Sequence, residues 1–534
     1  MANNSRGWLC AVGAAALLAV PAAIAPPASA QGTGLQASSD AAKSVDLRTA
    51  PEVPAVALPA GLAINRPTIP MADYVAAKNA AAARVGGSRP QSAAAPPPAT
   101  GVTLFTQVGS TNESQTTGGN RFPPDGDVAT SATWMVQVNN DIIVMYNWLN
   151  NAFVSKNFAT FFQDGIHALF HPRVIYDPYW DRFVVLADAC DLCSGMGNTS
   201  FFKLAVSHTG DPSGAWIVYN VGIGAAMGDF ADFPQLGMDL NSIIFTYNDF
   251  LADGGFEART FAVAKAYLYN GLSFGVVPVF GGSACTNAPP YVLDNSGVDY
   301  IVAFCPGDNK VYIGSLRDTG LSTVSINLWD NTVAVGSLSG LPPNAPQPGV
   351  NYPLDTGDNR FENRSLQVGS RILNTATILD GTATAAWYDF NIGVSPHTLQ
   401  AGGIWFATGT SSDWHPAINA NTIGAGASPV GEIFGTWMSV DATNNVNVQL
   451  RAIGGAADLA GSGAGITVYT SPLPLTNQTD GGGIHRSGAY SYIALYPAAA
   501  LGCASPGEIG ILEGETATGM AGLWGTRIGI VKHC

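Results

Sequence analysis

The sequence Val174-Ile-Tyr-Asp-Pro-Tyr-Trp-Asp-Arg-Phe-Val-Val185 contains an apolar strand, a turn and a second apolar strand. The same layout recurs in residues 236–245 and 291–302. Aspartate is favoured in such turns because its carboxylate accepts backbone N–H groups two residues further on. Each of the three copies has one, namely Asp177, Asp239 and Asp294, spaced 62 and 55 residues apart. Weaker copies begin near Val138, Ile372, Ile418 and Ile493.

These seven units extend over about 430 residues, or roughly 60 residues each. A unit of this length suits one four-stranded blade with long loops, and radial repetition of blades leaves few exposed strand edges. The sequence therefore predicts an all-β fold, a β-propeller with seven blades; a six-bladed ring and a pair of β-sandwiches are the alternatives. Helix is expected to be scarce, because no long run holds a capped 3.6-residue period.

The composition supports this prediction and excludes some partners. Only 11% of the 534 residues are charged, while Gly (62) and Pro (34) are abundant, as suits many short strands joined by turns. The formal net charge is -15. Nucleic acid binding requires clustered Lys and Arg, and so does docking on an anionic membrane. Neither partner is expected.

The N-terminus has the pattern of a secretory signal peptide. Arg6 is followed by the apolar run Trp8–Val20, and the small residues Ala28 and Ala30 match a cleavage site, which makes Gln31 the expected mature start. The alternative is an uncleaved anchor helix, although the apolar run is short for spanning a bilayer. We expect residues 1–30 to be a signal peptide, with no membrane span after cleavage. The protein is then secreted or extracellular, with the periplasm or the cell surface as alternatives.

Residues 31–100 are rich in Ala, Pro and Ser and contain few large apolar residues. Such a segment buries too little surface to offset the entropy of ordering. We expect a flexible tether, with a short helix near Ala72–Val85, followed by one propeller domain over residues 101–534.

Six cysteines remain after Cys10, an even number that suggests three disulfides in an oxidising compartment. Fifteen pairings are possible, and pairing between neighbours is the simplest: Cys190 with Cys193, Cys285 with Cys305, and Cys503 with Cys534. A redox role for the Cys190-Asp-Leu-Cys193 motif is the alternative, but no βαβ pattern surrounds it.

Two groups of polar residues are candidates for a site. Asp229, Asp232 and Asp239 form the densest acidic patch and could bind Ca²⁺, which prefers oxygen ligands, or serve only as turn residues. No other cofactor is expected. The candidate ligand-binding residues are Arg173, Arg364, Arg486 and Tyr490. The arginines stand beside predicted inner strands, and Tyr490 is near the last of these strands. Inter-blade salt bridges are the alternative role for these arginines.

The chain resembles a family of bacterial secreted β-propellers with no established activity, which is loosely similar to BNR and sialidase-type propellers. The matching segments are Asp177-Pro-Tyr-Trp-Asp-Arg-Phe183, Asp211-Pro-Ser-Gly-Ala-Trp216, Asp232-Phe-Pro-Gln-Leu-Gly-Met-Asp239 and Trp524-Gly-Thr-Arg-Ile-Gly529. Arg486-Ser-Gly-Ala-Tyr-Ser491 departs from the family pattern R-W-G-D-Y-S, because Ser487 and Ala489 replace its Trp and Asp. The Asp-box signature of sialidases has no intact copy.

Three functions remain open. The first is a monomeric, non-enzymatic binding module for a glycan or a cell-surface protein. The second is a sialidase-like glycoside hydrolase, which needs an arginine clamp for a carboxylate and a Tyr–Glu pair, roles that Tyr490 and Glu362 could take. The third is a structural envelope protein. Convergence of Arg173, Arg364 and Arg486 beside such a pair would favour hydrolysis, and dispersal of the arginines would favour binding.

Overall fold

The computed structural model describes residue 37 to the C-terminus, apart from residues 60, 61, 63, 85–105, 112–122, 141, 196, 224, 284, 295, 307, 318–324, 336–339, 422–431, 457–462, 477, 478, 480–483, 489, 498–502, 505, 506 and 518–523. The expected signal peptide, residues 1–30, lies outside the described residues. So do parts of the expected tether, residues 31–36 and 85–100.

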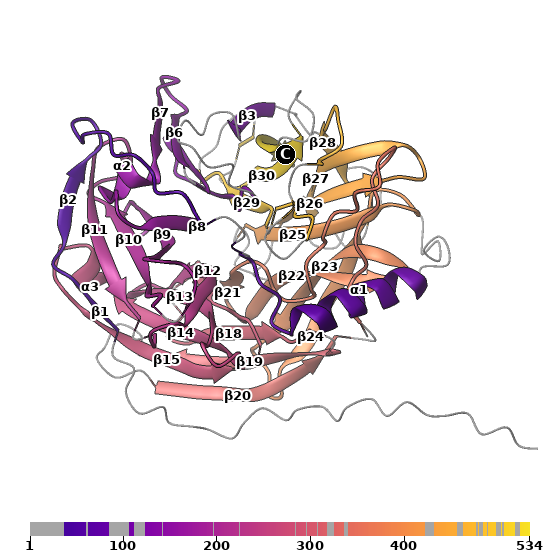
Figure 1. Ribbon diagram of the computed structural model, residues 1–534, viewed down its shortest axis with the longest axis horizontal. Helices are drawn as coiled ribbons and strands as arrows, with labels where there is room; N and C mark the ends of the chain where they lie inside the picture. Colours follow the sequence, from indigo (N-terminus) through magenta and orange to yellow (C-terminus); the bar gives the residue numbers. More distant parts are fainter. Residues whose placement is uncertain are drawn as a thin grey trace, which may run out of the picture.

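The chain forms an all-β propeller, as predicted, in which antiparallel groups of strands surround a common axis (Figure 1). The first four strands after the N-terminal region are β4 (Asp127–Thr130), β5 (Trp134–Asn139), β6 (Ile142–Asn147) and β7 (Phe153–Asn157). The next eight are β8 (Ala168–Asp177), β9 (Arg182–Cys190), β10 (Ser200–Ser207), β11 (Ala215–Gly222), β12 (Phe230–Met238), β13 (Ser242–Phe250), β14 (Phe256–Ala264) and β15 (Gly275–Ser283).

The second half of the ring repeats this arrangement. Its strands are β16 (Asn287–Ala288), β17 (Pro290–Val292), β18 (Asp299–Phe304), β19 (Lys310–Arg317), β20 (Ser325–Ala334), β21 (Ser365–Val368), β22 (Arg371–Asp380), β23 (Thr382–Asn391) and β24 (Thr398–Trp405). The last strands are β25 (Ser412–Ala420), β26 (Glu432–Asp441), β27 (Val446–Ala456), β28 (Ile466–Thr470), β29 (Tyr492–Leu495), β30 (Ile509–Ala517) and β31 (Trp524–Lys532).

The number of blades differs from the expectation of seven, or six. Counted as separate hydrogen-bonded sheets of described residues, the propeller has five blades: four of four strands and one of fifteen. The largest sheet contains three four-stranded meanders, β8–β11, β12–β15 and β21–β24. Two short strands bridge them, since β1 (Ala37–Ser39) pairs with both β11 and β15, and β17 pairs with both β12 and β21. The sequence repeats do not reveal these bridges, because each involves only one to three residue pairs.

The ring is closed by strands from the two ends of the domain. Strand β3 (Thr106–Thr111) is the fourth strand of the sheet β29–β30–β31 and pairs with β31 in antiparallel orientation. The Cys503–Cys534 disulfide joins the segment before β30 to the residue after this last sheet. The other disulfides are Cys190–Cys193 and Cys285–Cys305, so the predicted pairing between neighbours is confirmed.

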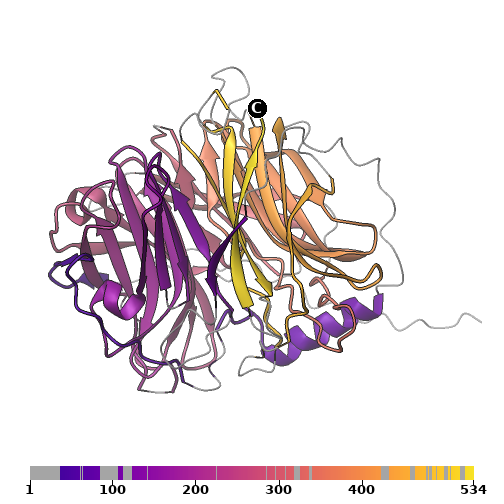
Figure 2. The ribbon, with the colours of Figure 1, turned by 90° about the horizontal axis from the view of Figure 1, so that it is seen from above.

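The described part of the expected tether, residues 37–84, is not a free linker. Strand β1 bridges two meanders, β2 (Lys43–Asp46) extends β11, and helix α1 (Met71–Arg84) lies along one face of the ring, opposite the C-terminus (Figure 2). Tyr74 and Lys78 of α1 are buried. The expectation of a flexible tether was wrong for these residues, because a few of their side chains are buried in the propeller. Amino-acid composition does not reveal such single contacts. The helix expected near residues 72–85 is present.

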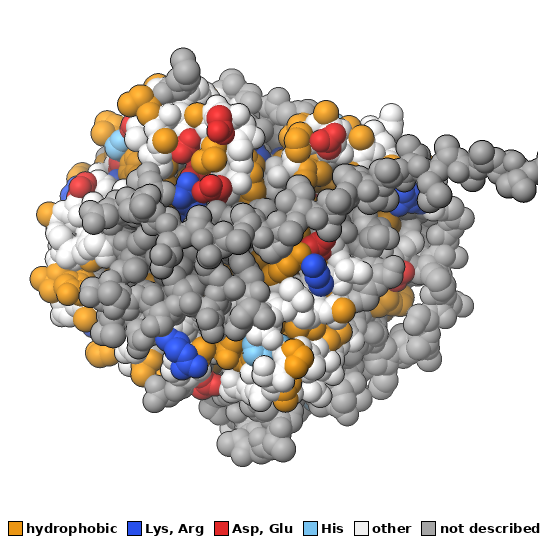
Figure 3. Space-filling model, turned by 90° about the horizontal axis from the view of Figure 1, so that it is seen from below, with side chains coloured by type: hydrophobic (Ala, Val, Ile, Leu, Met, Phe, Trp, Pro, Cys, Tyr) orange, Lys and Arg blue, Asp and Glu red, His pale blue; other side chains and the backbone are white. Residues whose placement is uncertain are grey.

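Helix is otherwise limited, among the described residues, to α2 (Phe158–Phe162) and α3 (Lys265–Leu268). No described helix has the length and apolar character needed to cross a membrane. In the side view of Figure 3, the described Lys, Arg, Asp and Glu side chains are few and interspersed.

The turn aspartates act as predicted. The carboxylates of Asp177, Asp239 and Asp294 each accept the backbone N–H of the residue two positions further on. For Asp177 and Asp239 this local bond stabilises the reversal between two paired strands, β8–β9 and β12–β13, whereas Asp294 lies between β17 and β18 of different sheets. The core between strands is built largely of apolar and aromatic side chains, and the largest fully buried ones include Trp387, Trp405 and Trp437.

Candidate functional site

Three inner strands carry the same irregularity near the axis. In β8, β12 and β25 the pairing register shifts by a bulge, and the bulged residue has a left-handed backbone with φ between 47° and 58°. A proline follows each bulged residue, in the pairs His171-Pro172, Phe233-Pro234 and His415-Pro416. Bulges of this kind change the direction in which a side chain points. Here they occur where His171 and His415 enter buried polar surroundings.

The first of these polar groups, the His171 cluster, consists of His171, Asp125, Asp188 and Asp232, all of which are at most 1% exposed. His171 Nε2 lies 2.8 Å from Asp125 Oδ2, and Nδ1 lies 2.9 Å from Asp232 Oδ1 and 3.4 Å from Asp188 Oδ2. These side chains come from β8, β9, β12 and the residues just before β4. Four segments of the first part of the ring therefore contribute to one buried site.

The pKa values in the His171 cluster reflect competition between burial and charge. Burial opposes the imidazolium form of His171, but the carboxylates of Asp125 and Asp232 raise its pKa well above the usual value. Burial likewise opposes the charge of Asp232, yet His171 and the backbone N–H of Arg66 lower its pKa to about 2. For Asp188 burial prevails and raises the pKa to about 8.

The second polar group lines a cavity of about 20 Å³ that we call the entry cavity, because it lies where the inner strands begin. Its lining residues are Asn65, Pro67, Tyr74, Phe233, Asp355, Gly357, Asp358, Arg360, Glu362, His415, Arg486 and Gly488. His415 Nδ1 is 2.8 Å from Glu362 Oε1, while His415 Nε2 and Glu362 Oε2 are buried without hydrogen-bond partners. This volume holds about one water, which these two atoms could bind.

The segment of residues 64–78, which we call the plug, lies over this cavity. Asn65 donates through Nδ2 to Asp125 Oδ1 at 3.0 Å, and Arg486 donates to the carbonyl of Ile64 at 2.9 Å. Further along, Tyr74 donates to Asp355 Oδ1 at 2.7 Å, and Lys78 Nζ lies 3.2 Å from the same oxygen. Charge-assisted bonds among buried groups hold the plug in place.

At the other ends of the inner strands lies a larger, mostly apolar hollow of about 150 Å³, which we call the exit pocket. It is lined by Val128, Ala129, Thr130, Tyr176, Pro178, Tyr291, Leu293, Arg364, Asn419, Tyr492, Ala494, Leu495 and Pro497. Arg364 donates to Asp127 Oδ2 at 2.9 Å, and its guanidinium carbon lies 3.9 Å from the centre of the Tyr492 ring. The Arg364 Nε is buried without a hydrogen-bond partner.

The four candidate ligand-binding residues do not converge on one site. Arg486 lines the entry cavity and Arg364 lines the exit pocket. Arg173 lies over the ring of Tyr490 at 3.4 Å and donates to the backbone carbonyls of Pro234 and Glu362. The structure thus brings Arg173 and Tyr490 together but separates them from the other two arginines, each of which has its own aspartate.

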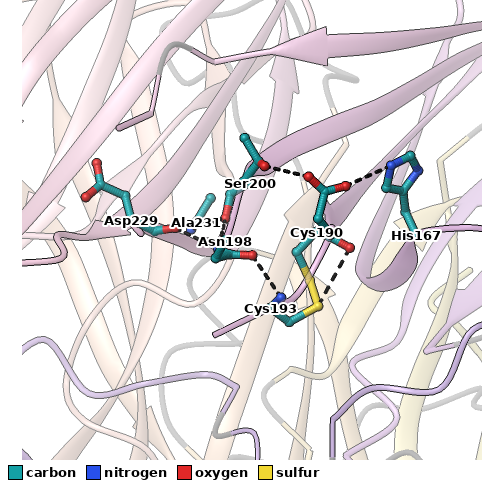
Figure 4. The surroundings of a disulfide bond; sticks show 9 residues. His167, Cys190, Cys193, Asn198, Ser200, Asp229 and Ala231 are labelled. Atoms are coloured by element: carbon teal, nitrogen blue, oxygen red, sulfur yellow. Dashed lines mark hydrogen bonds and ion pairs between the residues drawn. A yellow bond between two sulfur atoms is a disulfide. The ribbon is translucent and has the colours of Figure 1, made fainter. Parts of the chain in front are cut away.

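The carboxylates of the three candidate metal residues also have different partners. Asp239 caps its turn, and Asp229 accepts the backbone N–H groups of Ala226 and Ala252. The carboxylate of Asp229 points away from the neighbouring Cys190–Cys193 disulfide, while its backbone carbonyl accepts a bond from Asn198 (Figure 4). Among the described residues, Asp232 alone of the three belongs to a group of three or more potential metal ligands, together with His171 and Asp188.

Sequence reasoning did not single out Asn65, Asp125, His171, Asp188 or His415. One signal was present in the sequence: His171-Pro172 and Phe233-Pro234 recur at the same 62-residue spacing as Asp177 and Asp239. A residue before proline at a constant position of a repeat indicates a special backbone conformation. No comparable signal marks Asp188, which lies within a regular strand.

No family model matches this chain, and no curated protein matches it. Solved structures that are similar to this chain include a Hadza microbial sialidase (TM-score 0.36, 10% identity, covering 60% of this chain and 66% of that one). Another is a Trypanosoma rangeli sialidase in complex with sialic acid (0.35, 11%, 71% and 55%). A third is an exo-β-1,3-galactanase from Clostridium thermocellum (0.30, 9%, 66% and 87%).

These neighbours are sialidase and galactanase structures at low identity. This chain spans less than two thirds of the length of either sialidase. A likeness of this degree says nothing about activity or ligand.

Proposed function

We propose that this protein is an exported binding module that holds a neutral glycan in the exit pocket. The observation that carries the proposal is the lining of that pocket, in which Tyr176, Tyr291 and Tyr492 surround a cavity of about 150 Å³ beside Arg364. Pockets that bind small ligands are lined mainly by apolar and aromatic side chains with a few placed polar groups. A tyrosine ring offers an apolar face to a sugar ring and a hydroxyl group at its edge.

The charge of the pocket favours a neutral ligand. The positive charge of Arg364 is already balanced by Asp127 at 2.9 Å, so little is left to attract a carboxylate. The chain as a whole carries a net charge of -15, which repels anionic ligands at long range. A neutral sugar hydroxyl could still accept a hydrogen bond from the Arg364 Nε, which has no partner.

Binding is favoured over hydrolysis by the chemistry of the same lining. Glycoside hydrolysis of the usual kind needs two carboxyl groups beside the scissile bond. Among the described residues that line the exit pocket, none is Asp or Glu. The nearby carboxylate of Asp127 is bound to Arg364, and other buried carboxyl groups line the entry cavity or lie in the His171 cluster.

Export is supported independently by the three disulfides, since such bonds persist in oxidising compartments. The proposed site of action is therefore outside the cytoplasm, and a structural envelope role without a ligand is the alternative.

The proposal is tested by screening the mature protein on an array of neutral and acidic glycans, followed by calorimetry with the best neutral ligand. Leu293→Trp places a large side chain at the half-buried rim of the exit pocket and is expected to weaken binding at least about 10-fold. Leu399→Trp makes the same change at an exposed position of β24 and should leave binding unchanged. The proposal would be contradicted if Leu293→Trp bound the glycan as tightly as the wild type. It would also be contradicted if the protein bound no neutral glycan on the array.

A further inference from the structure

We propose that the His171 cluster is a binding site for one zinc ion, with His171 Nδ1, Asp188 and Asp232 as its ligands. Each of these three residues offers one atom, and the three atoms lie within 4.8 Å of one another. All three side chains are at most 1% exposed. The site is distinct from the exit pocket and does not depend on what that pocket binds.

Several polar atoms of the cluster make close contacts but no hydrogen bond of good geometry. Both carboxylate oxygens of Asp188 and both ring nitrogens of His171 are buried without a hydrogen bond of acceptable geometry. Such atoms are uncommon in folded proteins because each costs about 1–3 kcal/mol when unsatisfied. His171 Nδ1 faces the carboxylates of Asp188 and Asp232, so a single cation between these three groups would satisfy several atoms at once.

The charge of the cluster also favours a cation. Asp125, Asp188 and Asp232 bring three carboxyl groups around one imidazole in surroundings that exclude solvent. Buried carboxylates are usually paired or coordinate a metal. A divalent ion would balance the negative charges of Asp188 and Asp232. The carboxylate of Asp125 would then pair with the imidazole of His171, which the ion polarises.

The types of ligand fit zinc better than calcium. Zinc takes nitrogen and carboxylate ligands at about 2.0–2.2 Å in tetrahedral geometry, which separates neighbouring ligand atoms by roughly 3.3 Å. The observed separations from His171 Nδ1 are 2.9 Å to Asp232 and 3.4 Å to Asp188. Calcium prefers six to eight oxygen ligands and rarely an imidazole.

The surroundings are of the kind that orients metal ligands. The backbone N–H groups of Phe233, Asn65 and Arg66 donate to the carboxylate of Asp232. On the far side of the imidazole, Nε2 lies 2.8 Å from Asp125 Oδ2, whose carboxylate also accepts from Asn65 and Asn140. A carboxylate behind a ligating histidine fixes the ring and makes the other nitrogen a better donor.

The test uses the full mature protein, expressed in zinc-supplemented medium and purified without chelators. We expect about one zinc per chain by elemental analysis, and an anomalous diffraction peak at the zinc edge between His171 and Asp188. Asp188→Asn preserves side-chain shape and should reduce zinc at least about 10-fold. Asp164→Asn, which alters another buried carboxylate beside a histidine, is the matched control and should retain it.

The outcomes separate the proposal from a metal-free network. A folded wild type without zinc, zinc located elsewhere, or equal zinc in wild type and Asp188→Asn would each overturn it. If Asp188→Asn fails to fold, His171→Gln provides the second variant, with circular dichroism as the check of folding. Calcium bound at this position in place of zinc would also overturn it.

Discussion

Asn65 donates its side-chain amide to the carboxylate of Asp125, 60 positions further along the chain, at 3.0 Å inside the ring. Asn65 has a left-handed backbone with φ of 56°, a conformation that asparagine tolerates better than most residues. The backbone N–H of the same residue donates to Asp232. One residue of the N-terminal region therefore links the plug to two segments of the propeller.

Replacing Asn65 with alanine should destabilise the protein by about 1–3 kcal/mol, because it leaves buried Asp125 with fewer donors. We expect this in chemical denaturation, together with faster proteolysis within residues 64–84. The control is Asn151→Ala, which also has a positive φ of 58° but lies exposed at a turn. Equal losses of unfolding free energy in the two variants would mean that the left-handed backbone, and not the buried amide of Asn65, causes the loss.

Gly435 in β26 allows the close approach of Trp405. A Cβ at position 435 would lie 2.4 Å from the Trp405 ring, which stacks on Trp387 and Trp437 and cannot move freely. Gly435→Ala should cost about 1–3 kcal/mol, with a changed near-ultraviolet circular dichroism spectrum. Gly409→Ala, where nothing lies within 4 Å, should leave both unchanged. An unchanged free energy of unfolding in Gly435→Ala would show that the tryptophans repack without loss of stability.

The Cys503–Cys534 disulfide closes a loop with a sequence separation of 31. Replacing both cysteines with serine should lower the free energy of unfolding by about 3–4 kcal/mol, because the unfolded chain regains the entropy of that loop. The Cys190–Cys193 pair closes a separation of only 3, so its double serine variant should lose roughly 1.5 kcal/mol. The two losses would be compared by denaturant unfolding; a larger loss for the shorter loop would contradict the entropic reasoning.

Burial raises the pKa of Glu513 to about 8, against the hydrogen bonds from Gln137 and Asn139, which lower it. The folded state thus binds a proton that the unfolded chain releases above about pH 4.3. The resulting stabilisation is complete below that pH and is lost as the pH rises toward 8. The glutamine in Glu513→Gln is neutral at every pH, so this variant does not lose stability in this way. As the pH rises from 5 to 8, the free energy of unfolding of the variant should therefore gain about 2–4 kcal/mol on that of the wild type.

This prediction is checked by denaturant unfolding at several pH values. Glu257→Gln, at a solvent-accessible carboxyl group of β14, is the control for the loss of one charge. A constant difference between Glu513→Gln and the wild type across this range would show that Glu513 is ionised in the folded protein.

Local features of this chain were predictable from sequence because they depend on neighbours along the chain. Alternating apolar strands and the aspartates at 177, 239 and 294 indicated strand–turn–strand units, and these form as expected. Pairing of neighbouring cysteines was the simplest of fifteen possibilities and is present. The separate partners of Arg173, Arg364 and Arg486 could not be predicted, because they come from distant parts of the chain.

The sequence by itself determined the all-β architecture, since strand periodicity and turn chemistry operate over a few residues. The tertiary structure decided where residues 37–84 lie, how the sheets merge, and that His171 meets Asp125, Asp188 and Asp232. Those contacts join residues between 17 and 422 positions apart. They depend on how the ring closes, and closure is a property of the whole packed chain that no local pattern encodes.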